Sequence, residues 1–340
     1  HFADLHIGSK FERLPEEIKK ELNTKLRNAF SSIISYANEN DINTVLMSGD
    51  IFDKSAVLLS DKNFFYDLIK ANPNIDFYYI KGNHDQKSKN NEEIDNLHTF
   101  DGVNSYIKGD VRITGYELSS DNSILYDYSP FITDKFNIMM LHGDINNSRG
   151  DDYIDLKKLE DKNINYFALG HIHKRGSGFI GRAKYEYPGC VIGRGFDETG
   201  DKGFLVLDTS TNTTEFIKLS EIYFEHMDIQ VNSLNEATLK AEIQNKLNGI
   251  NKNVITEVRL TGKADFDIDT DDLNRTYDSY RKYIVFKNAY KKALSYTQSE
   301  NENSLKNMFI NKILNDESLD EDTKEKIIEY GLSKLMKEEG

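Results

Sequence analysis

The segment INYFALGHIH (residues 164–173) is an apolar run that ends on two histidines. A short apolar run that stops at glycine is typical of a buried β-strand. His171 and His173 are two positions apart, so in an extended chain their side chains point to the same side. A single histidine in such a place is more often a structural hydrogen-bonding residue than a metal ligand. The meaning of the pair therefore depends on which side chains lie at the ends of the other predicted strands.

Three further apolar runs end in the same way, and helical segments lie between the first two. The runs are NTVLMSG (43–49), DFYYIKG (76–82) and FNIMMLHG (136–143). Residues 26–40 and 61–72 carry apolar side chains at helical spacing. Alternating strands and helices predict an α/β fold, with a parallel or mixed sheet covered by helices.

The pattern changes after about residue 190, and we expect three parts. Residues 1–220 form the α/β part, which ends in a hairpin of two strands around the turn STNT (210–213). Residues 221–298 combine three strand patterns with two helical ones, which predicts a small α+β domain. Residues 299–340 begin with the polar linker SENENS and continue as two amphipathic helices, which either pack on the body or bind a partner.

Composition limits the class of protein. The 340 residues include 38% hydrophobic and 29% charged residues, as in an ordinary globular protein. The single cysteine, Cys190, excludes an internal disulfide framework and fits a reducing compartment. Neither a membrane span nor a signal-peptide pattern is present, so we expect a cytoplasmic protein with no membrane association. The chain starts inside an apolar segment, and we expect one or a few residues before His1.

The net charge of −14 argues against nucleic-acid binding by the surface as a whole, but it allows local basic clusters. One early cluster includes Lys10, Lys19, Lys20 and Arg27. A second includes Lys174 and Arg175. Contact with phosphate groups and simple solvation are both open interpretations of these clusters.

Metal-ligand residue types come directly after each apolar run and also occur near the start of the chain. They are Asp4, His6, Asp50, Asn83, His84, Asp85, His142, His171 and His173. The carboxyl ends of neighbouring strands in an open α/β sheet meet at one edge, so we expect these side chains to converge. Such a repeated coincidence favours a metal site over unrelated structural roles.

Nitrogen and oxygen donors without thiolate suit manganese, iron or zinc. Leaving His84 and Asp85 aside, seven donors are too many for one ion and fit two divalent ions that share a bridging carboxylate. Asp50 is the natural bridge because it has two oxygens and no carboxylate neighbour before Asp53. Two ions about 3.5–4 Å apart are the usual device for hydrolysis of phosphate esters.

Five short motifs carry a resemblance to a known family. DLH, GDIFD, GNHD, LHGD and GHIH, in this order, resemble the motifs of the calcineurin-like metallophosphoesterases. GDIFD together with YPGCVIGRGFDETGDKGFLVLD (187–208) is similar to the SbcD-type DNA repair exonucleases. The motifs cover about residues 1–219, and residues 221–290 resemble, more weakly, the capping domain of those nucleases. The resemblance implies a two-sheet sandwich flanked by helices.

The resemblance also implies roles for individual residues. One ion would be held by Asp4, His6, Asp50 and His173, and the other by Asp50, Asn83, His142 and His171. His84 would face the scissile phosphate instead of a metal, and Asp85 would orient it. Asp53 stands where some relatives carry a second catalytic histidine.

The implied activity is a metal-dependent DNA nuclease, an exonuclease with an associated endonuclease activity, that works in DNA repair or DNA end processing. Manganese is the expected metal, with iron, magnesium or zinc as alternatives. The expected partners are DNA, an SbcC-type coiled-coil ATPase that docks on the helices at 303–337, and a second copy of the chain. A small-molecule phosphodiesterase or phosphatase that uses the same binuclear site is the alternative. A non-catalytic scaffold is disfavoured because all seven ligand types and His84 are present.

Overall fold

The computed structural model describes two compact units. The first comprises His1–Met227, Ile250–Glu257 and Thr276–Val285, and the second comprises Asp228–Gly249, Val258–Arg275 and Phe286–Gly340. The description covers the chain except for residues 13, 54–56, 86–93, 120–121, 129–130, 132, 220–222, 233, 249–252, 279–282, 293–304, 321–322, 325, 329 and 332–340. No helix among the described residues is long and apolar enough to cross a membrane.

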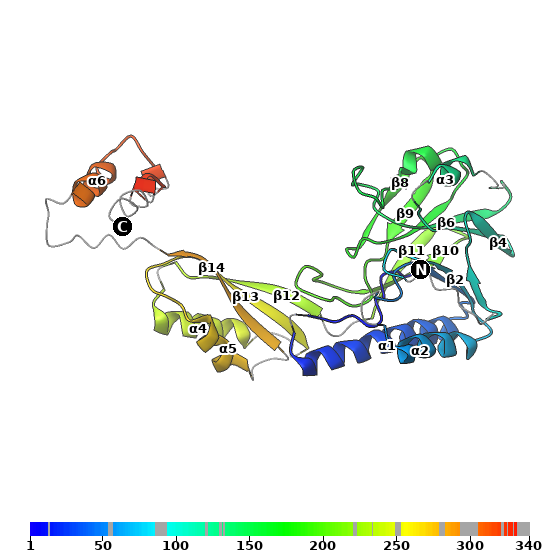
Figure 1. The fold of residues 1–340 in the computed structure, drawn as a ribbon, viewed down its shortest axis with the longest axis horizontal. Helices are drawn as coiled ribbons and strands as arrows, with labels where there is room; N and C mark the ends of the chain where they lie inside the picture. The colour runs from blue at the N-terminus through cyan, green and yellow to red at the C-terminus, as the bar shows by residue number, and fades with distance from the viewer. Residues whose placement is uncertain are drawn as a thin grey trace. The chain divides into compact units, whose positions relative to one another are not determined.

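A small parallel sheet and two long helices form one side of the first unit. The sheet has the order β1-β2-β3, with β1 at Thr44–Ser48, β2 at Asp76–Ile80 and β3 at Leu97–Thr99. The helices α1 (Glu16–Glu39) and α2 (Leu59–Lys70) lie side by side (Figure 1). Their apolar faces pack in one core cluster with Val45, Met47 and Phe77 of the sheet. The helices therefore cover one face of this sheet.

The second sheet of this unit has six strands in the order β4-β5-β6-β7-β9-β8. Strands β5, β6, β7 and β9 are parallel, whereas β4 and β8 pair antiparallel at the two edges. Their bounds are Asn104–Lys108, Val111–Tyr116, Phe136–His142, Tyr166–Gly170, Gly176–Ile180 and Ala183–Tyr187 for β4 to β9. The short helix α3 (Ser123–Asp127) and the 3₁₀ turn η1 (Leu156–Leu159) contribute Leu125, Leu156 and Leu159 to the core on its outer face.

Side chains that alternate along β1 and β2 join the two sheets into a sandwich. Leu46 and Tyr78 point away from the helices and form a buried cluster with Ile113, Ile138 and Tyr166 of the larger sheet. Because successive residues of a strand face opposite sides, fully apolar strands such as TVLM can fill two cores at once. The predicted α/β class and the two-sheet sandwich flanked by helices are confirmed.

The strands predicted at 43–49, 76–82, 136–143 and 164–171 are all present, and so is the hairpin of β10 (Gly203–Asp208) and β11 (Thr213–Lys218). Helix α1 starts at Glu16, ten residues before the predicted segment 26–40, because Leu22 continues its buried stripe. The strands β3, β4, β5, β8 and β9 were not predicted. β3, β4 and β8 are short or only partly buried, whereas β5 (VRITGY) and β9 (AKYEY) mix polar residues with apolar ones, so the hydrophobic patterns of all five are weak.

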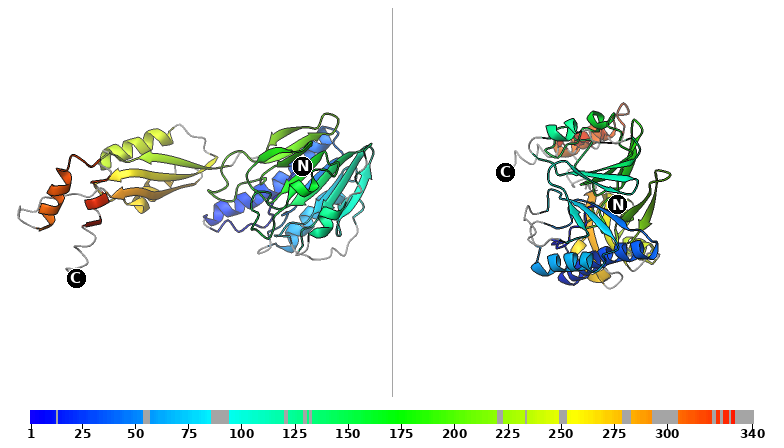
Figure 2. Two further views of the ribbon diagram at one scale, coloured as in Figure 1. Left: turned by 90° about the horizontal axis from the view of Figure 1, so that it is seen from above. Right: turned by 90° about the vertical axis from the view of Figure 1, so that its right-hand side faces the viewer.

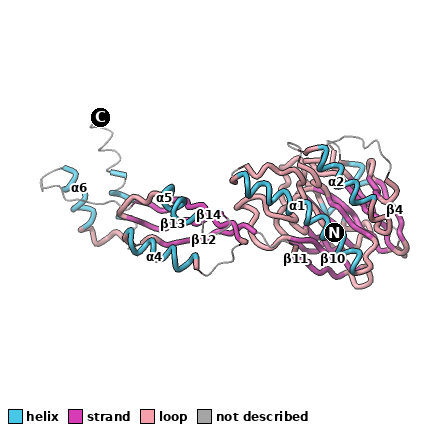
Figure 3. The backbone as a smooth tube through the Cα atoms, turned by 90° about the horizontal axis from the view of Figure 1, so that it is seen from below, coloured by secondary structure: helices cyan, strands magenta, loops and turns pink. Residues whose placement is uncertain are grey.

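A three-stranded sheet and two helices make up most of the remaining chain (Figures 2 and 3). The strands are β12 (Tyr223–Gln230), β13 (Val254–Ala264) and β14 (Tyr283–Lys292), and the helices are α4 (Glu236–Leu247) and α5 (Thr270–Tyr277). Within the second unit, α4 buries Leu239, Ile243 and Leu247 at helical spacing. These are the elements that the sequence predicts for a small α+β domain.

The first of the two predicted C-terminal helices is present as α6 (Leu305–Leu314). Residues 323–324, 326–328 and 330–331 are also helical, whereas the rest of the predicted helix at 322–336 and the linker at 299–304 lie outside the described residues. Ile310 and Ile328 are both buried, and a β-carbon on Gly331 would clash with the ring of Phe309. The two segments therefore pack on each other.

Candidate metal centre

The predicted ligand side chains converge at the carboxyl ends of β1, β2, β6 and β7. Groups of carboxylate and imidazole atoms that lie within 4.8 Å of one another are formed by Asp4, His6 and His173 and by Asp4, Asp50 and His142. Four residues of the site have left-handed backbone conformations, namely Asp4 (φ 53°), His6 (φ 49°), Asp50 (φ 51°) and His171 (φ 95°). This conformation is strained for residues other than glycine, and such strain is concentrated at functional sites.

Three of the predicted ligands form the first part of the site. The Nε2 atoms of His6 and His173 lie 3.2 Å apart, and Nε2 of His173 lies 3.7 Å from Oδ1 of Asp4. Both oxygens of Asp4 also accept the backbone N–H of His171 at 3.1 Å. Nε2 of His6 lies 3.7 Å from Oδ2 of Asp50. Asp50 therefore faces this group, as the bridging role requires.

Asp50 also faces the second part of the site. Its Oδ2 lies 3.3 Å from Nε2 of His142, which in turn lies 3.2 Å from Oδ1 of Asn83. The other ring nitrogen of His142, Nδ1, hydrogen-bonds the carbonyl oxygen of Ser48 at 2.8 Å, which directs Nε2 into the site. The ring of His171 packs edge-on against that of His142, with 5.3 Å between the ring centroids. All seven predicted ligands thus lie together.

The chemistry of these groups fits bound cations. Asp4 is buried, and burial raises its pKa to about 7 although two histidines oppose the shift. Burial lowers the pKa of His6 to about 3, and its Nδ1 has no hydrogen-bond partner among the described residues. Burial also disfavours the charged form of His142, but its hydrogen bond to Asp50 and the charge of Asp4 raise its pKa to about 9. Buried carboxylates and facing imidazole nitrogens of this kind are satisfied by a metal ion.

His84 lies beside these ligands and forms a third close group with His6 and Asp53, separate from the two groups that contain Asp4. Its Nδ1 is 3.7 Å from Oδ1 of Asp53, its ring meets that of His6 edge-on, and its side chain is 39% exposed. Its backbone N–H donates to Oδ1 of Asp50 at 2.7 Å. His84 is thus fixed at the site by its main chain, while its imidazole remains accessible to a substrate.

The structure differs from the expectation that Asp85 orients His84. The buried carboxylate of Asp85 accepts the backbone N–H groups of Ile51, Phe52 and Gly82, at 3.3, 2.8 and 2.9 Å. Its oxygens hold together the two loops that come after β1 and β2. The carboxylate that approaches the ring of His84 is Asp53, because it sits on the loop after β1, which faces the loop carrying His84.

A comparison with protein families decides the identity of this fold and site. Residues 1–175, half of the chain, match the family model described as calcineurin-like phosphoesterase. The chain belongs to the calcineurin-like phosphoesterases. Members of this family are metal-dependent hydrolases of phosphate esters, which agrees with the ligand groups described above. The predicted superfamily is therefore confirmed.

Individual proteins similar to this calcineurin-like phosphoesterase are more distant. The uncharacterized metallophosphoesterase YhaO of Bacillus subtilis is 28% identical over 70% of this chain, which spans 64% of that relative's length. The DNA double-strand break repair protein Mre11 of Methanocaldococcus jannaschii is 27% identical over 71% of this chain and 72% of its own length. Among solved structures, the Plasmodium inner-membrane-complex anchor GAP50 covers 79% of this chain and 96% of its own, with 11% identity and a TM-score of 0.40.

Two glycines of the phosphoesterase site lie so close to the ligands that a side chain would displace them. A β-carbon on Gly82 would collide with Asp50 and would lie 2.7 Å from Nε2 of His142. A β-carbon on Gly49, whose φ is +86°, would collide with the ring of His142. Glycine is therefore needed in both GD and GN turns so that the backbone can approach the ligands closely.

Residues of the phosphoesterase site that the sequence did not assign come from the segment after β9. Oε1 of Glu198 lies 2.6 Å from Nδ1 of His173, and the guanidinium of Arg194 contacts both Glu198 and His173. Both residues lie in the segment 187–208, whose sequence is similar to the SbcD-type exonucleases. This similarity marks the segment but does not give either residue a role. Cys190 is buried beside Glu198, which agrees with a packing role.

Proposed function

We propose that this phosphoesterase is a metal-dependent DNA nuclease of the SbcD type that acts in DNA repair or DNA end processing. The observation that carries the proposal is the convergence of seven residues with nitrogen or oxygen donors, Asp50 among them, with His84 beside them. Support for DNA as the substrate comes from the relatives named DNA double-strand break repair protein Mre11. Two divalent ions, with manganese as the preferred metal, complete the proposal.

The ligand residues divide into two sets that share Asp50. Asp4, His6 and His173 would hold one ion and Asn83, His142 and His171 the other. The bound ions would supply positive charge for the phosphate oxygens and an activated water. Hydrogen bonds from the backbone to Asp4 and from His142 to the Ser48 carbonyl fix the direction of these ligands before any substrate binds.

In this proposal His84 would serve the reaction as the proton donor to the leaving oxygen, or as a charge that stabilises the phosphate in the transition state. Its imidazole is accessible beside Asp50, and Asp53 faces its Nδ1 at 3.7 Å. Nε2 is then the atom that carries the proton toward the substrate.

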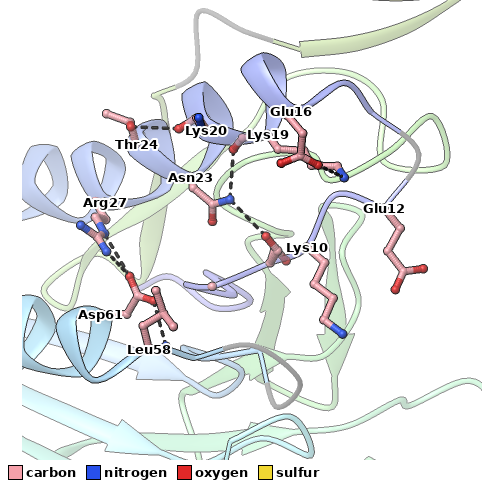
Figure 4. A pocket seen from close by; sticks show the side chains of 12 residues that line it. Lys10, Glu12, Glu16, Lys19, Lys20, Asn23, Thr24, Arg27, Leu58 and Asp61 are labelled. Carbon is pink, nitrogen blue, oxygen red and sulfur yellow. Dashed lines mark hydrogen bonds and ion pairs between the residues drawn. The ribbon is translucent and has the colours of Figure 1, made fainter.

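A cleft next to this site offers room for a chain of phosphates. It has a volume of about 680 Å³ and is lined by residues of α1, of α2 and of the segments before them (Figure 4). The lining includes Ser9, whose hydroxyl donates to Asp53. Lys10, Lys19 and Lys20 line it, and Lys19 forms an ion pair with Glu16. This early basic cluster supports contact with a nucleic-acid backbone. The second cluster supports it less, because the guanidinium of Arg175 lies over the ring of Phe216.

The test of the proposal is manganese-dependent degradation of linear duplex DNA by the purified chain. We expect conversion of end-labelled duplex into short products with manganese and none with chelator. A protein with both metals bound that degrades neither duplex nor single-stranded DNA would contradict the proposal. Cutting of circular DNA, measured in parallel, would report the associated endonuclease activity.

The alternative is a small-molecule phosphodiesterase or phosphatase with the same ions. The net charge of −14 favours it, because a strongly acidic surface repels a polyanionic substrate. Turnover of bis-nitrophenyl phosphate and of DNA by one preparation separates the two functions. High turnover of the small ester without loss of DNA would establish the alternative.

We further propose that the helical segment after residue 304 binds an SbcC-type coiled-coil ATPase. Leu305 and Met308 of α6 are exposed. Phe309 of the same helix instead packs against Gly331. Exposed apolar residues on one side of an amphipathic helix suit docking onto another helix. Co-purification of the chain with such an ATPase tests this proposal. The double variant Leu305→Asp, Met308→Asp should no longer co-purify with the ATPase. Binding of the ATPase by the double variant would contradict the proposed surface.

A further inference from the structure

The buried carboxylate of Glu198 contacts the candidate metal ligand His173 on the side of its ring that points away from the other ligands. Oε1 of Glu198 lies 2.6 Å from Nδ1 of His173, on the side of the ring opposite Nε2. Nε2 itself points to Asp4 and His6, at 3.7 and 3.2 Å. A metal-binding histidine usually donates its other ring N–H to a carboxylate or carbonyl, which fixes its tautomer and orientation. The arrangement here has this geometry.

Glu198 is itself held firmly by three groups of its own segment. Its Oε2 accepts the backbone N–H of Arg194 at 2.8 Å, and it lies 3.4 Å from Sγ of Cys190. Its Oε1 accepts from Nη2 of Arg194 at 3.0 Å. The side chain is only 8% exposed. Glu198 therefore has little freedom to turn away from His173.

Arg194 extends this arrangement toward the other side of the site. Its Nε and Nη2 both face Glu198, while Nη1 lies 3.8 Å from Oδ2 of Asp53, the carboxylate beside His84. The planar fork of an arginine suits such simultaneous contacts with two carboxylates. Nη2 also lies 3.0 Å from Nδ1 of His173, so this nitrogen faces both the guanidinium donor and the carboxylate acceptor of Glu198, and the carboxylate is the nearer at 2.6 Å. Arg194 thus contacts Glu198, His173 and Asp53 and serves as a bridge within the site.

We propose that Glu198 is a positioning residue that keeps the proton of His173 on Nδ1 and its Nε2 directed at the metal, and that Arg194 links this pair to Asp53. Both residues lie beyond residue 175, where the match to the family model ends. The segment after β9 thus completes a site whose five metallophosphoesterase motifs all lie before it. The inference rests on the candidate metal centre and does not depend on DNA being the substrate.

The tautomer of His173 in the metal-free protein tests the first part directly. Long-range ¹H–¹⁵N spectra distinguish a proton on Nδ1 from one on Nε2, and a His173→Gln variant assigns the signal. We expect the Nδ1–H form in the wild-type chain and a mixture of tautomers in Glu198→Ala. A wild-type His173 with its proton on Nε2 would overturn the proposal, and this outcome needs no variant to fold.

A matched control is available in the same unit. His226 faces the buried Glu257 with 3.2 Å between Nδ1 and Oε1, so it is a similar pair that lies among none of the candidate ligand groups. Glu257→Gln should leave the spectrum of His173 and the binding of manganese unchanged. Equal losses in Glu257→Gln and Glu198→Gln would show a general effect on the fold and would overturn the assignment of a specific role.

Manganese titration by calorimetry tests the consequence for the metal. Loss of the partner of a ligating histidine weakens metal binding by about 10–100-fold, and we expect this for Glu198→Ala at one of two sites. Glu198→Gln, which keeps an acceptor oxygen, should lose less. Wild-type affinity at both sites in both variants would overturn the proposal. Neither readout uses DNA, so a missing nuclease activity would leave this result interpretable.

The role of Arg194 is tested by exchanging its fork for a single charge. Arg194→Lys keeps the positive charge but cannot face Glu198 and Asp53 together. We expect a His173 signal intermediate between those of the wild type and Glu198→Ala, together with an altered signal of His84. Wild-type signals of both histidines in Arg194→Lys would show that no link passes through the guanidinium.

Discussion

The Nε2 atoms of His6 and His173 lie 3.2 Å apart, although 167 positions separate the two residues in the sequence. Two neutral imidazoles that face each other in this way can share at most one proton between these atoms. A cation between them and the nearby carboxylates of Asp4 and Asp50 satisfies all four groups. This relationship is the basis of the first prediction.

Divalent metal should stabilise the folded chain. Binding to the folded state alone adds about 2.7 kcal/mol to the free energy of unfolding at a free metal concentration of about 100 times Kd. We expect manganese to raise Tm and a chelator to reverse the change, as measured by scanning calorimetry. Asp4→Asn should lose most of this increase, whereas the exposed Asp161→Asn should keep it. An Asp4→Asn variant with the full increase would exclude Asp4 as a ligand.

Gly82→Ala should disturb the metal centre without a long-range effect on the fold. Its β-carbon would collide with Asp50 and approach Nε2 of His142, so the shared carboxylate must move. We expect weaker manganese binding, by about 10-fold or more, in calorimetric titration. Gly176→Ala is the control, because a β-carbon there has no neighbour within 4 Å. Equal affinities in the two variants would contradict the geometry of the Asp50–His142 pair.

His84→Ala should retain metal and lose turnover. A positioned acid or base contributes about 10²–10⁴-fold to a rate, and we expect a decrease in kcat of that order with bis-nitrophenyl phosphate. The manganese affinity should remain that of the wild type, because His84 belongs to neither of the two ligand groups that contain Asp4. His226→Ala is the matched control with unchanged kcat. Unchanged turnover in His84→Ala would remove this residue from the mechanism.

Asp53→Asn and Asp85→Asn should have different effects. Asp53 faces His84, so its loss should lower kcat by about 10-fold and shift the pH profile, with little change in stability. Asp85 accepts three backbone N–H groups, so an amide there should cost about 1–3 kcal/mol of stability in urea denaturation. If Asp85→Asn alone altered the pH profile, the pairing of His84 with Asp85 expected from the sequence would be reinstated.

Asp76 should make the stability of the chain dependent on acid pH. Burial raises its pKa, but hydrogen bonds from Lys108 and His98 outweigh this, so the pKa lies below its ordinary value. A lowered carboxyl pKa contributes stability above about pH 4, which is lost as the pH falls through the folded-state pKa. We expect Asp76→Asn to cost about 0.5–1 kcal/mol at pH 7 and less at pH 3. The exposed Asp110→Asn should cost nothing detectable at either pH.

The sequence predicts much of the fold because long apolar runs and long amphipathic helices carry strong periodic signals. β1 and β7 are buried along nearly their whole length, and their sequences are correspondingly apolar. The edge strands β4 and β8 alternate between half-buried and exposed positions, and β8 contains two glycines. Their strand state depends on pairing with distant neighbours, which local sequence does not encode.

Asp4 and His6 lie beside isolated β-bridges near the start of the chain, and the other ligands lie at or just beyond the end of a strand that is visible in the sequence, so the ligand set could be predicted. Strand order then places these ends at one edge, whatever the details of the loops. The partners of His84 and His173 could not be predicted in this way. Asp85 is the sequence neighbour of His84, but its side chain turns to the backbone of the loop after β1, and Asp53 takes its place.

The α/β class and the metal-ligand types can be read from the amino-acid sequence, since they depend on periodicity and on short motifs, and the resemblance that these motifs carry implies the family and the two-sheet sandwich. Which side chains touch is a property of the folded chain alone. Glu198 reaches His173 across 25 positions and Asp53 reaches His84 across 31, because chain turns bring distant loops together at the strand ends. Hydrogen bonds and ion pairs act over about 3–4 Å. A small difference in the path of a loop, with the motifs unchanged, therefore decides which carboxylate becomes the partner of a given histidine.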